Sequence, residues 1–325
     1  MSAPAKSVER PYRAAPEIAR LEQQWWDENA PLVAKVWELH DEVSRVARWR
    51  YLQRARHFFA TGHDDAHVVE LGCGSGWVGQ SICGRGLRIT GTDFSASQIA
   101  LARENAARRG LGAFTHYQVA TSGVWPSLDR AGTGILIHAF LHHLDGAELD
   151  AFFDMLHRNV APGTQIWIYE PAFHPDPPAG PAADPFAYRA ATTIVAHMSK
   201  LYRRLDLIDT DTRDRFAALF ARANDAGWHL SPKEVPFQLE AFDRELARHV
   251  AVTQSYWATA LVIGWVFETN LIRSSVLRLL AAQTVVRLLA QLDGRLVRDD
   301  AFMRRNCTAP NYGFRVWEGS LRDAR

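Results

Sequence analysis

Residues 68–80 have the sequence VVELGCGSGWVGQ, an apolar run that leads into a glycine-rich loop. Two glycine patterns overlap in this stretch. One is G-x-G-x-x-G, from Gly74 to Gly79, and the other is E-x-G-x-G-x-G, from Glu70 to Gly76. Each pattern is a known form of nucleotide-binding turn between a strand and a helix. The fold class is therefore indicated at once, but the ligand depends on which pattern the loop uses.

The position of the preceding strand favours the second pattern. Leu71 leads directly into Gly72, so a tight turn at that glycine would point backbone N–H groups at a ligand. A loop that began at Gly74 would leave two residues without a role. A carboxylate at Glu70 suits a cationic ligand better than a pyrophosphate. A glycine pattern alone is a weak signal, so the other strands must be considered.

Apolar segments alternate with helical patterns beyond the loop. We expect strands at 67–71, 87–92, 114–120, 134–138 and 165–169. Such alternation predicts a doubly wound α/β fold with a parallel sheet. Ligands of these sheets bind at the carboxyl ends of the strands, so the residues that follow each strand are the candidates for function.

Asp93 closes the second predicted strand, 21 residues after Gly72. Its carboxylate could accept hydrogen bonds from both hydroxyls of a ribose, in a nicotinamide dinucleotide or in S-adenosylmethionine alike. Phe94 could lie against an adenine ring or belong to the core. Ser95 and Gln98 form an S-x-x-Q capping box that predicts the start of a helix.

Histidines follow the fourth predicted strand. His138 ends that strand, and His142 and His143 come shortly afterwards. Either of the last two could act as a general base, because the ordinary pKa of histidine lies near 6.5. Both could instead be structural, since a group transfer can proceed by alignment of the reactants alone, without a base. A metal site is disfavoured because no acidic or cysteine ligand flanks them at a suitable spacing.

Four segments together resemble the class I S-adenosylmethionine-dependent methyltransferase family. They are VVELGCGSG, TGTDFS, HAFLHHL and APGTQIWIYEP, within residues 65–171. The resemblance implies a Rossmann-like mixed sheet of seven strands. Its last two strands would lie near 228–239 and 311–318, with a helical insertion between them.

The resemblance also implies the cofactor, S-adenosylmethionine, and its contacts. The glycine loop would hold the methionine part and Asp93 the ribose. Thr121 stands where the family often has an acidic residue for the adenine amine. The predicted cofactor contacts are Glu70, Gly72, Cys73, Gly74, Gly76, Asp93, Phe94, Gln98, Thr121, Ser122 and His138.

We expect four regions along the chain. They are an N-terminal helical cap or arm (1–60), the cofactor-binding core (61–171), a mostly helical insertion (172–310) and a final strand with the C-terminus (311–325).

The cap and the insertion are expected to build the acceptor pocket. In the cap, Asn29 is predicted to cap a helix that begins at Pro31. The candidate acceptor contacts, chosen by position, are Trp25, Trp26, Glu170, Tyr202 and Arg203.

Composition excludes several classes of protein. The net charge is +1, from 37 basic and 36 acidic residues, which disfavours a nucleic-acid ligand. The three cysteines form no C-x-x-C pattern, so we expect neither a disulfide framework nor a zinc site.

The location of the protein is predicted from what the sequence lacks. The first residues hold no apolar segment of the secretory kind, so the expected location is the cytoplasm. The apolar stretch 256–267 is too short to cross a bilayer and is expected to be a buried helix or the interface of a homodimer.

The sequence therefore predicts a methyltransferase that acts on a small-molecule acceptor. Oxygen, nitrogen, sulfur and carbon acceptors all remain open. One alternative is an NAD-dependent oxidoreductase that uses the pattern from Gly74 to Gly79. Another is a non-catalytic protein of the same fold that serves as a partner subunit.

Overall fold

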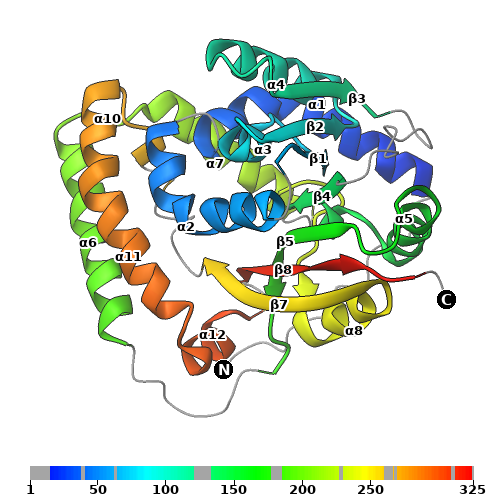
Figure 1. Ribbon diagram of the computed structural model, residues 1–325. Helices are drawn as coiled ribbons and strands as arrows, with labels where there is room; N and C mark the ends of the chain where they lie inside the picture. The colour runs from blue at the N-terminus through cyan, green and yellow to red at the C-terminus, as the bar shows by residue number, and fades with distance from the viewer. Residues whose placement is uncertain are drawn as a thin grey trace.

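The fold is built on one mixed β-sheet, seen in a computed structural model that describes residues 15–37, 41–61, 64–120, 133–176, 185–226, 230–259, 266, 269–308 and 312–323 (Figure 1). The strands run in the order β3-β2-β1-β4-β5-β8-β7, and β6 pairs with β5. Strands β1 to β6 pair in parallel, whereas β8 is antiparallel to both β5 and β7. The strands are β1 (Ala66–Leu71), β2 (Leu87–Asp93), β3 (Thr115–Val119), β4 (Thr133–His138), β5 (Gln165–Phe173), β6 (Phe237–Gln238), β7 (Val250–Thr259) and β8 (Gly313–Leu321). The predicted Rossmann-like mixed sheet is confirmed.

Helices cover both faces of the sheet. Ser95 caps α4, as the sequence predicts, and Asp145 caps α5, each with its side chain accepting a backbone N–H of the first turn. The helices are α1 (Ala15–Trp37), α2 (Asp41–Ala60), α3 (Trp77–Ile82), α4 (Ala96–Arg108), η1 (Leu141–His143), α5 (Gly146–Asn159), α6 (Phe186–Arg204), α7 (Thr210–Asp225), α8 (Leu239–His249), α10 (Ser275–Ala281), η2 (Ala282–Val286), α11 (Arg287–Leu296) and α12 (Asp300–Asn306).

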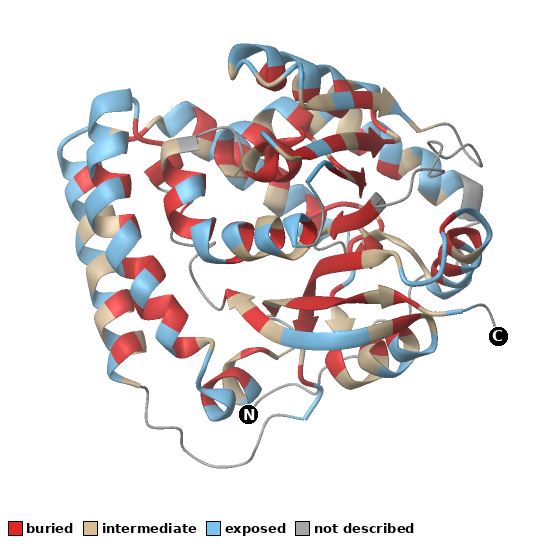
Figure 2. Cartoon of the chain, in the orientation of Figure 1, coloured by how far each residue is buried: buried red, intermediate tan, exposed pale blue. Residues whose placement is uncertain are grey.

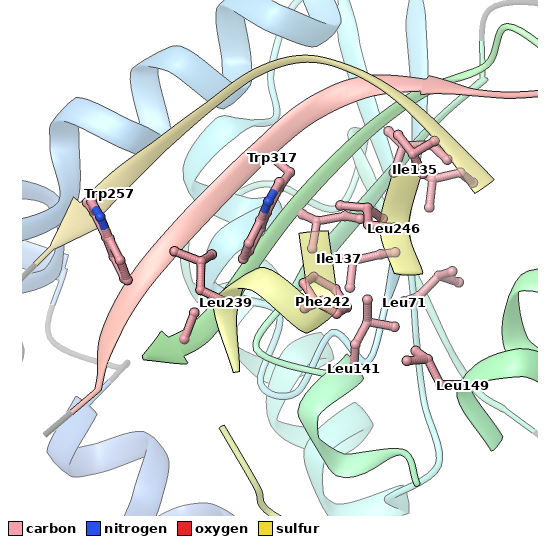
Figure 3. Packing of buried hydrophobic residues seen from close by; sticks show 14 of the residues in the cluster. Leu71, Ile135, Ile137, Leu141, Leu149, Leu239, Phe242, Leu246, Trp257 and Trp317 are labelled. Atoms are coloured by element: carbon pink, nitrogen blue, oxygen red, sulfur yellow. The ribbon is translucent and has the colours of Figure 1, made fainter. Parts of the chain in front are cut away.

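The two faces of the sheet bury different side chains of the same strands. Val68 packs towards α2 and α3, whereas its neighbour Val69 packs towards α5 and α8, as the alternation of a strand requires. Figure 2 shows the central strands β1 and β5 as largely buried and the middle of the edge strand β7 as exposed. Figure 3 shows the cluster that contains Val69, in which Trp317 lies beside Phe242.

The first helix corrects a sequence prediction. Helix α1 continues through Pro31, and Asn29 does not cap a new helix, since its Nδ2 donates to the carbonyl of Trp25. Proline removes one hydrogen bond from a helix interior. The buried side chains of Ala30 and Val33 flank it on one face, and this packing holds the helix together.

The segment before the last strand corrects another prediction. The insertion 172–310 was expected to be mostly helical, but α8 ends at His249 and the chain continues as β7. The interface helix predicted over 256–267 is therefore wrong for 256–259, while 260–265 and 267–268 lie outside the described residues. A short apolar run can form either a helix or a strand. This segment forms a strand because its backbone pairs with the edge of β8.

The strand expected at 228–239 is likewise much shorter than predicted. Only β6, of two residues, pairs with the sheet in this region, and 227–229 lie outside the described residues. Strand β8 lies instead between β5 and β7, antiparallel to both.

Helices α10 and α11 continue one another through η2 and pack beside α6 (Figure 1). This run of 22 residues, Ser275–Leu296, is long and apolar enough by composition to cross a membrane. A buried core helix of a globular protein can meet the same criterion, and 33% of the apolar 18-residue window in this run is buried. The expectation of no transmembrane segment stays a prediction.

Candidate cofactor and acceptor site

A pocket lies at the carboxyl ends of β1, β2 and β4, where the sequence places the candidate residues. The glycine loop and Asp93 line one side of it. Side chains of α1 and α2 cover it, and residues from the segments before β6 and at the start of β8 complete the wall.

The glycine loop has the geometry that the pattern E-x-G-x-G-x-G predicts. Gly72, Gly74 and Gly76 have φ values of 66°, 51° and 76°, in the left-handed region that favours glycine. A Cβ at Gly72 would lie 2.5 Å from Cδ2 of Phe140. The loop therefore needs glycine for its backbone conformation, and at Gly72 also for space.

Gly79, by contrast, belongs to helix α3 and not to the loop. A Cβ there would lie 2.4 Å from Oε2 of Glu70 and 2.8 Å from Cγ2 of Ile89. The backbone N–H of Gly79 donates to the same Glu70 oxygen, at 3.2 Å. Glu70 thus fixes the start of α3 against the sheet while it also lines the pocket.

Asp93 connects the loop to the second strand. Its Oδ2 accepts from the N–H of Gly74 and its Oδ1 from the N–H of Ser95, each at 2.9 Å. Burial raises the pKa of Asp93 to about 6, against the opposing effect of these two hydrogen bonds. A carboxylate oxygen can accept more than one hydrogen bond, so Asp93 retains capacity for ribose hydroxyls.

Gln98 supplies a second sign that a ligand belongs here. Its Oε1 is buried and has no hydrogen-bond partner among the described residues, and it lies beside the loop at Gly74. A buried acceptor without a partner is costly, and a ligand N–H or O–H would satisfy it. Cys73 and Phe94 also line this side, whereas Thr121 and Ser122 lie outside the described residues.

His142 is oriented by a buried carboxylate behind the pocket. Its Nδ1 lies 2.7 Å from Oε2 of Glu170. Glu170 also accepts from the backbone N–H groups of Phe140 and Leu141, at 2.8 and 2.7 Å. Burial raises the pKa of Glu170 to about 7 although these hydrogen bonds oppose it. Glu170, which the sequence predicts as an acceptor contact, is fully buried and does not line the pocket, so it would act through His142, which it orients.

His143 is paired with the cap. Its Nδ1 lies 2.9 Å from Oε1 of Glu22 on α1. Glu22 also accepts from Nε1 of Trp26, Oγ of Ser231 and the backbone N–H of Lys233. Burial opposes both charges, yet this contact raises the pKa of His143 and, with the other hydrogen bonds, lowers that of Glu22. The two form a buried ion pair that ties α1 to the loop after β4.

His138 has no such acidic partner. It stacks on Tyr169 with ring centroids 4.1 Å apart, and its edge faces Trp77. Burial and the nearby Arg48 hold the pKa of His138 well below its usual range, so the ring is neutral. It lines the pocket as an aromatic surface.

The candidate acceptor contacts are only partly brought together. Trp26 lines the pocket, but Trp25 and Tyr202 are buried in a separate core between α1, α6 and α7, and Arg203 is exposed. The sequence pattern could not show which of the two adjacent tryptophans faces the pocket. The pocket-lining residues that sequence reasoning missed include Trp37, Arg48, Trp77, Tyr169, Glu234, Tyr312 and Phe314.

Among the residues that the structure describes, no group of three histidine, cysteine or acidic side chains could hold a metal ion. Cys73, Cys83 and Cys307 are buried and form no disulfide.

Known proteins resemble this chain in sequence and in fold. Residues 68–163 match the model of a family described as a methyltransferase domain. The crystal structure of the [4+2]-cyclase SpnF is 15% identical over 93% of this chain and 96% of that chain, with a TM-score of 0.50. This likeness shows that the two chains share a fold.

Two further solved structures cover 90% of this chain, with TM-scores of 0.47. Both are S-adenosylmethionine-dependent methyltransferases in complex with S-adenosylhomocysteine. The protein from Geobacter sulfurreducens is 17% identical over 98% of its own chain, and that from Thiobacillus denitrificans 15% over 97%.

Proposed function

Because this chain carries a methyltransferase domain of the class I, S-adenosylmethionine-dependent family, we propose that it transfers a methyl group to a small-molecule acceptor. The family that the four sequence segments predict is confirmed, and with it S-adenosylmethionine as the cofactor of this domain type. The identity of the acceptor is part of the proposal.

The residues of the pocket fit this cofactor. The loop from Gly72 to Gly76 would hold its methionine part, Asp93 its ribose, and Gln98 a hydrogen-bond donor of the ligand. When bound, it supplies a methyl group on a positively charged sulfur, which is a strong electrophile. The acidic lining from Glu70 and Asp93 complements that positive charge.

The strongest support for the proposal is the set of residues that share one pocket. The glycine loop, Asp93 and the unpartnered Oε1 of Gln98 share one pocket with the covered aromatic region beyond the loop. A cofactor side and an acceptor side are therefore continuous under the same cap. The covering helices α1 and α2 favour a small acceptor that is shielded from water over an extended macromolecule.

The position of the first glycine disfavours the oxidoreductase alternative. Strand β1 ends at Leu71, and Gly72, with a φ of 66°, makes the turn directly after it, two residues before the Gly74 at which a G-x-G-x-x-G loop would begin. The possibility of a protein that does not transfer methyl groups needs a test of turnover, because one fold can host several reactions.

We also propose that the protein acts in the cytoplasm. The support comes from the sequence prediction, together with the three cysteines, which form no disulfide. Homodimer formation is open, and light scattering of the purified chain would measure it.

The proposal is tested by calorimetry on the purified protein. We expect S-adenosylhomocysteine to bind one site per chain with a Kd in about the micromolar range, and NADH to give no heat of binding. Failure to bind the former at about 1 mM would sink the proposal, as would specific binding of NADH.

A further inference from the structure

Aromatic rings form a belt around the acceptor side of the pocket. The belt begins on the cap, where the ring centroid of Trp26 lies 5.8 Å from that of His143. His143 lies 4.1 Å from His142. On the far side, Tyr312 lies 5.7 Å from Phe314.

The belt continues from Phe314 along the sheet. Its centroid is 5.0 Å from that of Tyr169, which stacks on His138 at 4.1 Å. His138 in turn lies 5.2 Å from Trp77. All these side chains line one pocket, so a molecule on its acceptor side would face aromatic rings from several directions.

Glu234 occupies the gap in this belt, between His142 and Tyr312. Its Oε1 accepts from the Tyr312 hydroxyl at 3.4 Å and lies 3.9 Å from Nε2 of His142. The side chain is 9% exposed, and its Oε2 has no hydrogen-bond partner among the described residues. Burying a carboxylate oxygen without a partner is costly, so a ligand donor at this point would be strongly favoured.

The other charged groups of the pocket are already held by the protein. Asp93 accepts two backbone N–H groups, and Glu70 accepts one at the start of α3. Arg48 donates to the carbonyl of Trp37 and lies over the Trp77 ring, 4.5 Å from its centroid. The carboxylate of Glu234 is thus the acidic group whose open oxygen belongs to the acceptor side.

We propose that the acceptor is an amine that enters this belt as an ammonium cation and is held by Glu234. This inference rests on the proposed methyl transfer and names its substrate class. Aromatic faces attract a cation, and the carboxylate supplies the matching charge and a hydrogen-bond acceptor. A neutral alcohol would leave the buried charge uncompensated, and a carboxylate substrate would be repelled.

The proposed step balances in protons and electrons. The bound ammonium gives one proton to the Glu234 carboxylate and becomes a neutral amine. The nitrogen lone pair then forms the bond to the methyl carbon, while the pair of electrons of the broken carbon–sulfur bond stays on sulfur. His142, 3.9 Å away and oriented by Glu170, stands where it can relay the proton from Glu234.

The test measures binding in the presence of saturating S-adenosylhomocysteine, by the shift of the unfolding midpoint. The probes are 2-phenylethylamine and tryptamine, compared with the alcohols 2-phenylethanol and tryptophol. The variant is Glu234→Gln, which keeps the size of the side chain and removes its charge. The matched control is Glu104→Gln, an exposed carboxylate on α4.

We expect the amines to raise the midpoint of the wild type and of the control, with little effect from the alcohols. In Glu234→Gln the amine shift should disappear, corresponding to at least about tenfold weaker binding, while S-adenosylhomocysteine still binds. Turnover of the amines should fall in parallel.

Two results overturn the inference while methyl transfer stands. One is an alcohol shift as large as the amine shift, or no amine shift at all, in the wild type that binds S-adenosylhomocysteine. The other is an amine shift that survives in Glu234→Gln. Wild type that fails to bind S-adenosylhomocysteine would instead remove the proposed function, so the two failures are distinguishable.

Discussion

Asp93 is the residue on which cofactor binding depends most directly. It accepts backbone N–H groups from the glycine loop and from the start of α4, so it both shapes the loop and faces the ligand. Its pKa of about 6, raised by burial, makes this interaction sensitive to pH near neutrality. Only the ionised form can accept hydroxyl protons with both of its oxygens.

The affinity for S-adenosylhomocysteine should therefore depend on pH below about pH 6. Above that value Asp93 is ionised before the ligand arrives, and affinity should be constant. Below it a proton must leave first, so the Kd should rise by about tenfold per pH unit. Calorimetry across this pH range measures how the Kd changes with pH. The Asp93→Asn variant should bind S-adenosylhomocysteine weakly, and its Kd should not change with pH. Equal affinity of the wild type at about pH 5 and about pH 7 would contradict the role of Asp93.

Gly79 tests the close packing of α3 against the sheet. A Cβ there meets Glu70 and Ile89 in a fully packed site, so Gly79→Ala should lower the free energy of unfolding by about 1–3 kcal/mol. Gly146→Ala is the matched control in a helix, since a Cβ there meets nothing within 4 Å. Urea denaturation compares the two variants. Equal stability would show that the space at Gly79 is not required.

The residues near the glycine loop were predictable because they follow strands at short, fixed spacing. Asp93 and Gln98 both lie at the pocket as the sequence predicts. Glu22 and Glu234 were not predictable, because they reach the site from distant parts of the chain. Glu22, for example, bonds to Ser231 across 209 positions, and no local pattern encodes such a pairing.

At the level of elements, helix α1 is held to the pocket by Glu22. This carboxylate joins α1 to His143 after β4 and to the segment at Ser231 and Lys233. It is buried, so its hydrogen bonds are not replaced by water when one partner is lost. The cap is therefore a packed part of the site and not a loose arm.

Replacing Glu22 by Gln should loosen α1. The change leaves the charge of His143 without its partner, so we expect a loss of about 1–3 kcal/mol in the free energy of unfolding. Hydrogen exchange in α1 should become faster than in the sheet. Glu28→Gln, on the exposed face of the same helix, should behave as the wild type. Unchanged exchange in Glu22→Gln would show that other contacts hold the cap.

The elements of the core were predictable where strands alternate with capped helices, as with the helix from Ser95. The elements beyond the core were harder to predict. Strand β7 was expected to be helical, because a short apolar run has no periodicity that distinguishes a strand from a helix. The segment forms a strand because it pairs with β8. Helix α1 was divided at Pro31, although packing keeps it continuous.

On the scale of the whole molecule, the pocket brings together parts that are far apart in sequence. The sheet supplies the loop and Asp93, the cap supplies Trp26 and Arg48, and the last strand supplies Phe314. A ligand that contacts all of them binds the native state only. Its effect on stability should therefore extend beyond the loop.

S-adenosylhomocysteine should stabilise the fold as one unit. At a hundredfold excess over Kd the expected gain is about 2.7 kcal/mol in the free energy of unfolding. Hydrogen exchange should slow together in the glycine loop, η1 and α1, and much less in α10, which lies away from the pocket. Protection limited to the glycine loop would show that the cap does not close on the ligand.

A crystal structure of the complex with S-adenosylhomocysteine tests the central assignment most directly. We predict that both ribose hydroxyls lie within hydrogen-bond distance of Asp93, with the methionine part along Gly72 to Gly76 and the sulfur facing the belt that contains Glu234. A ligand whose ribose hydroxyls bind other groups, or that lies outside this pocket, would contradict it.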